Sequence, residues 1–448
     1  MPLDARRAVD PSAALKIAVI GSGVAGLSAA WLLSARHSVT LYEKAQKPGG
    51  HANTIDVPTR SGLVPVDAGF IVFNRRSYPN FVALLGSLGV GISETCMSFA
   101  VSLDGGRIEY AGRTLSSVFA RRRLLASPSH WLMLADIARF QHEAREAVKT
   151  GIAEHISVAE FSLAKGFSRA FLTRFLEPMA SAIWSTPSSR ILDYPAASLF
   201  RFYDNHGLLQ VLNLPKWNTV AGGSREYVRR LAAPLMEKAR FNAGVARIER
   251  DPEGVHVIDE NGGRDCFDEA IIATHADAAL RMLAEPTERE RLILSAFRYQ
   301  PNRAVMHFDE KQMPVRRRAW SSWNYLGGAD APSVTYWMNN LQGLSCAEDI
   351  FVTLNPVTPI DRQKVIAEFD YDHPMFDVMA MKAQRDIWTI QGVGGVWYCG
   401  AHLGSGFHED GLQAGLAVAE AIGGVRRPWS VPDESGRLAG VHLLATAS

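Results

Sequence analysis

The segment LKIAVIGSGVAGLSAAWLLSARHSVTLYEK, which begins at Leu15, restricts the possible folds more than any other stretch of the chain. Apolar residues 17–20 predict a short buried strand, residues 25–35 predict a helix, and residues 39–42 predict a second strand. Gly21, Gly23 and Gly26 form G-x-G-x-x-G between the first strand and the helix. The first glycine permits a tight turn, the second lets the backbone approach a pyrophosphate, and the third lets the helix pack on the strand. This spacing predicts a dinucleotide site at the helix N-terminus, where free N–H groups face the phosphates. A plain turn without a ligand is the alternative.

An acidic residue, Glu43, follows the second predicted strand. It lies about 20 residues after the glycines, the position at which a carboxylate binds the ribose hydroxyls of an adenosine. A carboxylate here also disfavours a ligand with a 2′-phosphate. The candidate contacts in this segment are Gly21, Gly23, Val24, Ala25, Gly26, Glu43 and Lys44.

The same segment has 19 uncharged residues, from Ile17 to Ala35, and so has the length of a membrane span or a signal peptide. The strand–turn–helix interpretation explains the three glycines, whereas a membrane helix leaves them without a role. The four cysteines are far apart and form no CxxC pair, which indicates free thiols in a reducing compartment. We therefore expect a cytoplasmic protein. The net charge of +1 gives no indication of nucleic-acid binding.

Two further glycine turns follow Glu43 and distinguish between NAD and FAD. Gly49-Gly50 forms one of them, and Asp67-Ala68-Gly69 forms the other. A ligand that extends further into the protein than NAD would need such close approaches of the backbone. These turns favour FAD.

Taken in order, these motifs resemble the FAD-dependent amine oxidases, phytoene desaturases and protoporphyrinogen oxidases. The resemblance implies an α/β fold, with a Rossmann-like FAD-binding domain of the GR2 type and a discontinuous mixed α+β substrate domain. It also implies that Val245 lies near the adenine, and that Asp410-Gly411-Leu412 replaces the family's Glu-Gly-Ala before a helix whose N-terminus faces the flavin. The chain has His51 where the family often has arginine. It has no clear counterpart of the cysteine that binds flavin covalently in some members, so we expect non-covalent FAD. The additional cofactor candidates are Gly49, Gly50, His51, Asp67, Ala68, Gly69, Phe70, Val245, Thr274, Gly400, Asp410, Gly411 and Leu412.

The positions of these motifs predict two discontinuous domains. Residues 1–77, 215–287 and 389–428 would form the FAD-binding domain. Residues 78–214 and 288–388 would form the substrate domain, and 429–448 a loose C-terminal tail. Within the inserts, residues 127–151 predict a helix with Ser127 as its cap, and RAVMHF, PSVTYWMNN and DIFVTLNP predict strands.

Acid–base residues are less well defined than the cofactor motifs. Lys216 and Trp217 precede the Gly222-Gly223-Ser224 turn, which resembles the family's turn between domains, and His307 and His402 lie near cofactor motifs. These four are the catalytic candidates, although each also fits a structural role. The sequence shows neither a Ser-His-Asp nor a metal-binding arrangement.

The substrate is expected to be apolar. The chain looks most like a bacterial branch of the superfamily associated with modification of fatty acyl chains, through the stretches WSSWNY, TVAGGSREYV and QGVGGVWYCGAHLGSGFHEDGL. The aromatic residues of the second insert would either pack in the core or line an apolar channel; they are Trp320, Trp323, Tyr325, Tyr336 and Trp337. Arg121–Arg123 and Arg316–Arg318 would either be solvated or contact anionic headgroups at the periphery of the inner membrane.

These observations predict an FAD-dependent oxidoreductase that accepts a hydride from a lipid acyl chain. An amine oxidase and a double-bond isomerase without net oxidation are the alternatives. The chain has no second G-x-G-x-x-G in a strand-to-helix context, so dioxygen or a quinone is a better candidate for the electron acceptor than NADPH.

Overall fold

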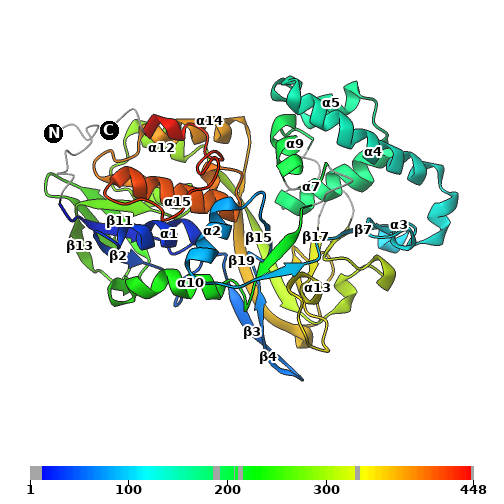
Figure 1. Ribbon diagram of the computed structural model, residues 1–448, viewed down its shortest axis with the longest axis horizontal. Helices are drawn as coiled ribbons and strands as arrows, with labels where there is room; N and C mark the ends of the chain where they lie inside the picture. Colours follow the sequence, from blue (N-terminus) through cyan, green and yellow to red (C-terminus); the bar gives the residue numbers. More distant parts are fainter. Residues whose placement is uncertain (1–12, 185–191, 206, 210–214, 328–332, 445–448) are drawn as a thin grey trace.

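The computed structural model describes residues 13–184, 192–205, 207–209, 215–327 and 333–444. Figure 1 shows a layered half that contains α1 (Val24–Leu33) and α15 (His408–Ile422), and a helical lobe at the other end of the molecule. Long strands lie between these two parts. The domain boundaries drawn from the sequence stay a prediction.

A parallel five-stranded sheet forms the centre of the first half, in the order β10-β2-β1-β14-β20. The central strands β1 and β14 are buried along almost their whole length, because helices and a small antiparallel sheet pack around them. All five strands end at the same edge, where an open α/β sheet binds its ligand. The strands are β1 (Lys16–Ile20), β2 (Ser38–Tyr42), β10 (Ala239–Arg240), β14 (Glu269–Ile272) and β20 (Val396–Tyr398).

Helices and a small antiparallel sheet surround this parallel sheet. Helix α15 packs along α1, and α10 also contacts α1. The other elements of this half are α2 (Pro79–Ser87), α10 (Arg225–Ala232), β11 (Val245–Arg250), β12 (Val255–Asp259), β13 (Arg264–Phe267), α11 (Ala276–Met282) and α12 (Glu288–Leu294).

A seven-stranded sheet, in the order β19-β15-β18-β17-β16-β7-β8, forms the middle of the molecule. The three stretches predicted as strands in the second insert lie in β15, β17 and β18, and residues 338–342 form a helix instead of continuing β17. The elements are β7 (Phe99–Leu103), β8 (Ile108–Ala111), β15 (Arg298–His307), β16 (Trp323–Leu326), β17 (Ser333–Trp337), α13 (Met338–Gln342), β18 (Phe351–Leu354) and β19 (Val365–Met375). Helix α14 (Val378–Asp386) follows β19 but packs against α12 in the first half.

Two small sheets join the large ones. Strands β3 (Thr54–Thr59) and β4 (Gly62–Asp67) form a hairpin, and β9 (Trp217–Val220) pairs with both β5 (Phe73–Asn74) and β6 (Ile92–Thr95).

The helical lobe packs around buried aromatic side chains such as Phe140, Phe171 and Phe200. Its main helix, α4, runs from Pro128 to Lys149, close to the predicted limits, but the Ser127 side chain does not cap it. The hydroxyl of Ser127 contacts that of Ser129 instead. The other elements are α3 (Leu115–Val118), α5 (Val158–Ala164), α6 (Arg169–Phe171), a π-helical turn (Leu172–Leu176), α7 (Glu177–Trp184) and α9 (Ala196–Asn205).

The prediction of a loose C-terminal tail is wrong for the described residues up to 444. Trp429 stacks on Trp31 with ring centroids 6.1 Å apart, and Leu438 is buried. The Arg427 guanidinium is buried and binds both Glu420 and Asn80. This anchoring depends on single long-range contacts, which hydrophobic periodicity does not detect.

The uncharged segment after Lys16 divides into strand, turn and a ten-residue helix. In the part of the chain that the structure describes, no helix has the length and apolar character needed to cross a membrane.

Candidate cofactor site

The first glycine turn lies at the carboxyl edge of the parallel sheet. Gly21 has φ of +99°, which favours glycine, and its N–H donates to the Tyr42 carbonyl at 2.8 Å. A Cβ on Gly26 would lie 1.9 Å from the Gly21 carbonyl oxygen, so only glycine permits this helix–strand contact. Two of the three predicted glycine roles therefore have a direct steric basis.

Gly23 differs from its neighbours because it faces open space. A Cβ on Gly23 would meet no atom within 4 Å, and its φ of −65° suits any residue. Gly23 is also the N-cap of α1, without a side-chain cap and without an acid in the first turn. The backbone N–H groups at this helix start can therefore bind an anion, and the free volume beside Gly23 fits a pyrophosphate.

The second glycine turn packs directly on the first. A Cβ on Gly50 would lie 3.2 Å from the Gly23 Cα, and Gly49 N–H donates to the Ser22 carbonyl at 3.0 Å. Glu43 also binds this region, because its Oε2 accepts from the Ser22 N–H at 2.9 Å and from the Ser22 hydroxyl at 2.5 Å. The predicted ribose acid thus lies beside the glycine turn at the end of β2.

The acidic residue of the third turn, Asp67, differs in function from Glu43. Asp67 is buried, and it accepts from the Thr54 hydroxyl, the Gln342 amide and both the N–H and the hydroxyl of Ser224. Burial raises the pKa of Asp67 to about 6. This carboxylate holds protein segments together, so we interpret it as a support for the site and not as a cofactor contact. Only the backbone after it remains available for a ligand.

The residues after Asp67 lie against His51. A Cβ on Gly69 would lie 2.2 Å from the His51 carbonyl oxygen, and that oxygen accepts from the Phe70 N–H at 2.8 Å. Ala68 N–H donates to the Asn53 carbonyl at 2.8 Å. The second and third turns therefore form one continuous backbone surface.

Helix α15 packs against α1 through two glycines. A Cβ on Gly411 would lie 2.9 Å from a Val24 methyl group, and one on Gly415 would lie 2.1 Å from the Ala25 carbonyl oxygen. The helix starts at His408, so the expectation that it starts after Gly411 is wrong. These glycines allow α15 to cross α1 closely. The glycines of α15 are therefore explained by helix packing, without a direct contact to the cofactor.

The two acids at the start of α15 are both buried. Glu409 accepts from the Phe81 and Asn80 N–H groups, and so it caps α2 from outside that helix. Asp410 accepts from the Phe407 N–H at 2.8 Å and forms an ion pair with Arg437, whose Nε lies 2.7 Å from the carboxylate. The Asp410 side chain is therefore occupied by protein groups, although it was a cofactor candidate.

The ring of His408 joins α15 to the third turn. It stacks on Phe70 with ring centroids 3.8 Å apart, and its Nε2 lies 2.6 Å from the Tyr227 hydroxyl. The next candidate, Leu412, is fully buried in the core of this half.

The edge of the sheet near Gly400 carries two more histidines. His402 is buried, and its Nε2 has no hydrogen-bond partner among the described residues. Its ring lies 6.4 Å from Tyr299, which stacks on His275 at 4.2 Å. Thr274 lies at the turn of Gly21, since a Cβ on that glycine would be 3.4 Å from its methyl group.

A further histidine comes from the second insert. His373 on β19 lies 5.9 Å from the ring of His51, and the neighbouring Tyr371 stacks on His51 at 4.7 Å. No local sequence motif identifies His275, His373, Tyr299 or Tyr371 as residues of the site. Their positions depend on how β15 and β19 approach the parallel sheet. These four residues could therefore not be recognised from the sequence.

We call His51, His275, His373, His402 and His408 the histidine group. Burial lowers the pKa of every member, to about 3 for His51, His402 and His408 and to about 4 for His373. The nearby His373 and His275 depress the pKa of His51 further. All five rings are therefore neutral at pH 7 and can accept or donate hydrogen bonds without introducing charge.

Two of the catalytic candidates are remote from this group. Lys216 is exposed and forms an ion pair with Glu94 at 2.9 Å. His307 ends β15 eight residues from Tyr299, and its nitrogens contact the Thr353 hydroxyl and the Asp309 N–H. Neither residue is a candidate any longer. His402 lies in the histidine group, and Trp217 starts β9 beside the Asn74 and Thr95 strands.

The adenine candidates lie near Glu43. Glu43 accepts from the Ala243 N–H through its carbonyl, and Val245 begins β11 two residues later. Lys44 is exposed beside Glu43.

The aromatic residues of the second insert divide into two sets. Trp320 and Trp337 form a small cluster with Phe351, and their indole N–H groups donate to Pro314 and Asp349. The packing alternative is right for these two. Tyr325 and Tyr336 belong to the larger apolar cluster of the seven-stranded sheet, and Trp323 packs against it.

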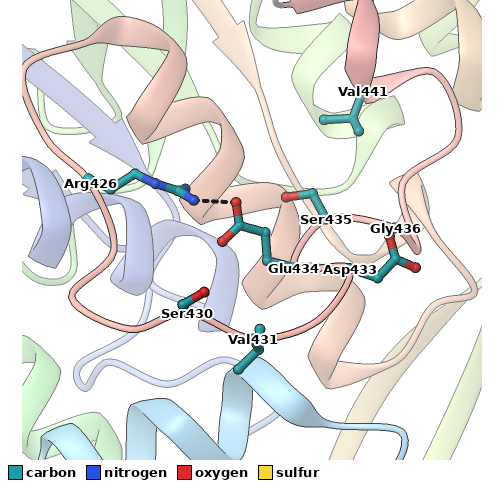
Figure 2. Close-up of a pocket in the computed structure, with 8 residues that line it drawn as sticks. All are labelled: Arg426, Ser430, Val431, Asp433, Glu434, Ser435, Gly436 and Val441. Atoms are coloured by element: carbon teal, nitrogen blue, oxygen red, sulfur yellow. Dashed lines mark hydrogen bonds and ion pairs between the residues drawn. The ribbon is translucent and has the colours of Figure 1, made fainter.

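Figure 2 shows a surface hollow of about 470 Å³ that is unrelated to the glycine turns. It is lined only by the C-terminal segment; the lining residues are Arg426, Ser430, Val431, Asp433, Glu434, Ser435, Gly436 and Val441. Arg426 pairs with Glu434 across it. The hollow contains none of the residues proposed for the cofactor.

Comparison with known proteins gives a consistent result. The family model described as flavin containing amine oxidoreductase matches residues 24–342. A curated relative, hydroxyneurosporene desaturase from Rubrivivax gelatinosus, is 43% identical over 68 residues, which is 15% of this chain and 12% of the relative.

Solved structures show the same fold at low identity. A fatty acid isomerase from P. acnes that produces CLA has a TM-score of 0.66 at 16% identity, over 93% of this chain and 99% of the other. Wild-type putrescine oxidase bound to putrescine has a TM-score of 0.64 at 14% identity, over 92% and 99% of the two chains.

Proposed function

Because this chain belongs to the flavin-containing amine oxidoreductase family, we propose that it is an FAD-dependent oxidoreductase that removes a hydride from a C–H bond of an apolar substrate. The family match supports a flavin cofactor and an oxidoreductase. The identity of the substrate rests on the chemistry of the residues around the third turn.

The residues fit non-covalent FAD in the following arrangement. The N-terminus of α1 and the space beside Gly23 would hold the pyrophosphate, and Glu43 with Val245 would hold the adenosine. The third turn and His51 would then hold the flavin end. Cys399 is buried, and burial raises the pKa of its thiol to about 12, which disfavours a covalent thioether link at this position.

One observation carries the choice of an apolar substrate. Ala68 in the third turn and Ile71 just after it belong to the same buried apolar cluster as Tyr325 and Tyr336 on the seven-stranded sheet. The histidine group beside them is neutral. Transfer of a hydrocarbon chain from water to such surroundings is favourable. Transfer of a charged ammonium group costs free energy, because the group loses its hydration.

We propose an unsaturated or methyl-branched lipid acyl chain as the substrate. The names of two relatives support this choice, since one is a desaturase and the other a fatty acid isomerase. We place the reaction in the cytoplasm.

Bound FAD supplies the acceptor for the hydride. The protein's own contribution is to orient the substrate, exclude water and take up a proton if a double bond forms. His402 is the candidate for the proton acceptor, because its Nε2 lacks a hydrogen-bond partner among the described residues. The glycines of QGVGGVW lie in a tight turn before β20 and not before a helix, which supports dioxygen or a quinone as the electron acceptor.

The test is anaerobic mixing of the FAD-loaded protein with phospholipids that carry monounsaturated or methyl-branched chains. We expect the flavin absorbance band to bleach and to return when air is admitted, with one new double bond in the lipid. An unchanged flavin band and unchanged lipid would overturn the proposal, and bleaching by amines would favour an amine oxidase. A moved double bond without lasting bleaching would identify an isomerase.

A further inference from the structure

The two arginine triplets, far apart in the sequence, lie side by side in the fold. The guanidinium groups of Arg121 and Arg316 both donate to the carbonyl of Gly106 at 3.0 Å. Arg316 also forms an ion pair with the buried Glu109 at 2.8 Å. Contacts between α3 and residues 317–319 join the same segments. The triplets therefore form one surface, which we call the arginine face; it consists of Arg107, Arg113, Arg121–Arg123 and Arg316–Arg318.

Most of the charge on this face is not neutralised by the protein. Within the part of the chain that the structure describes, five guanidinium groups have no carboxylate or carbonyl partner; they belong to Arg107, Arg113, Arg122, Arg123 and Arg318. From residue 107 to 132 the chain has five arginines and one acid, Glu109, which is already paired. The whole protein carries a net charge of only +1, so the positive charge is concentrated here.

Exposed apolar side chains lie among these arginines. Leu115 is 82% exposed and Val315 is 73% exposed, although leucine and valine usually avoid water. Val315 lies against Gly106, the residue that joins the triplets. Leu125, Trp131 and Leu132 are each about half exposed, and the Trp131 indole donates to the Leu125 carbonyl. This combination of exposed apolar groups and unpaired arginines is unusual for a solvated surface.

The arginine face lies away from the parallel sheet. Figure 1 shows α3 and the start of α4 at the end of the molecule opposite to α1 and α15. The face therefore belongs neither to the cofactor turns nor to the histidine group.

We propose that the arginine face binds the surface of an anionic phospholipid bilayer. The unpaired guanidinium groups would contact headgroup phosphates, and the leucines, valine and tryptophan would insert at the level between headgroups and acyl chains. The exposed leucines match a bilayer and have no counterpart in the phosphate backbone of a nucleic acid. This inference stands without the proposed function, but it places the protein where a lipid substrate would be found.

The test is sedimentation of the FAD-loaded protein with vesicles of phosphatidylglycerol and phosphatidylcholine. We expect binding to the mixed vesicles and little to phosphatidylcholine alone. The triple variant Arg113→Gln, Arg122→Gln, Arg123→Gln should reduce binding at least about tenfold, because each basic residue near an anionic surface contributes substantially. The variant Leu115→Ser, Leu125→Ser should reduce the fraction of binding that survives high salt, since salt screens only the charges.

The control is a matched set on α12, where Arg289, Arg291 and Leu292 are also exposed but lie among acids. The variant Arg289→Gln, Arg291→Gln, Leu292→Ser should bind vesicles as the wild type does. Flavin content and melting temperature verify that each variant is folded. Equal binding to phosphatidylcholine, or equal losses in the control and the face variants, would overturn the proposal. So would a changed oligomeric state with unchanged vesicle binding, which would identify a surface for self-association.

Discussion

At the scale of single residues, a substitution of Gly23 should affect cofactor binding without affecting folding. A Cβ at this position meets no protein atom within 4 Å, and the backbone angles suit alanine. Gly23→Ala should therefore leave the melting temperature of the FAD-free protein within a few degrees of the wild type. It should weaken FAD binding at least about tenfold, which corresponds to about 1.4 kcal/mol, because the methyl group occupies the space for the pyrophosphate. Quenching of flavin fluorescence during titration measures this affinity.

Gly26→Ala provides the contrasting case. Its Cβ would lie 1.9 Å from the Gly21 carbonyl oxygen, so the substitution should lower the melting temperature even without FAD. If Gly23→Ala bound FAD normally, the pyrophosphate would not lie at this turn and our placement of the cofactor would be wrong.

Another residue-scale prediction concerns Arg437, which anchors the C-terminal segment. The Asp410 carboxylate is fully buried, and burial raises its pKa while Arg437 opposes that shift. Arg437→Met should lower the free energy of unfolding by about 3 kcal/mol at pH 7.5, the usual result of leaving a buried charge unpaired. The loss should shrink as the pH falls, because protonated Asp410 is neutral and needs no partner. Urea unfolding at several pH values measures both effects.

The double variant Arg437→Met, Asp410→Asn isolates the ion pair. The asparagine side chain would keep a carbonyl oxygen for the Phe407 N–H, so the double variant should be more stable at pH 7.5 than Arg437→Met alone. If it were equally unstable, the contacts of Arg437 with Ser77 and Tyr78 would account for its role instead.

At the scale of elements, the crossing of α1 and α15 determines the position of both helix N-termini. Gly415→Ala would place a methyl group 2.1 Å from the Ala25 carbonyl oxygen, so the helices must separate. We expect the free energy of unfolding to fall by about 2 kcal/mol, as for other overpacked cores, and FAD affinity to fall with it. Gly86→Ala on α2 is the control: its Cβ meets nothing within 4 Å, so this variant should be as stable as the wild type or slightly more so.

The elements that the sequence predicted well are those with strong local patterns. The strand before Gly21, helix α1, helix α4 and the strands of the second insert all lie within a few residues of their predicted positions. The start of α15 was wrong because Phe407 and Asp410 make a cap that is not recognisable from helix-capping residue types. The C-terminal segment was wrong because its anchoring depends on single long-range contacts, such as Trp429 with Trp31.

The candidate site shows the same division. The glycine turns were predictable because each needs a residue without Cβ at a fixed position in the chain. The histidine group was not, because His275 and His373 lie almost 100 positions apart and meet only when β19 packs beside β15. For Lys216 the structural alternative given in the sequence analysis is right, because its side chain forms an ion pair with Glu94 at the surface.

At the scale of the whole molecule, the histidine group joins the two halves. His51 comes from the second glycine turn and His408 from α15, whereas His373 comes from the long strand β19. Burial of these neutral rings makes the stability of the protein depend on pH. A histidine whose pKa is lowered in the folded state takes up its proton mainly after unfolding, so stability is lost as the pH falls below about 6.5.

His402→Gln tests this dependence, because glutamine stays neutral at every pH. The pKa of His402 is lowered to about 3, so between pH 7.5 and 5.5 only the unfolded chain takes up the proton. The wild type should therefore lose about 1.4 kcal/mol more than His402→Gln over this range, as measured by urea unfolding with excess FAD. His142→Gln on the exposed side of α4 is the control and should follow the wild type. If His402→Gln lost as much stability over this range as the wild type, the folded protein would take up the proton as readily as the unfolded chain, and burial would not lower the pKa of this ring.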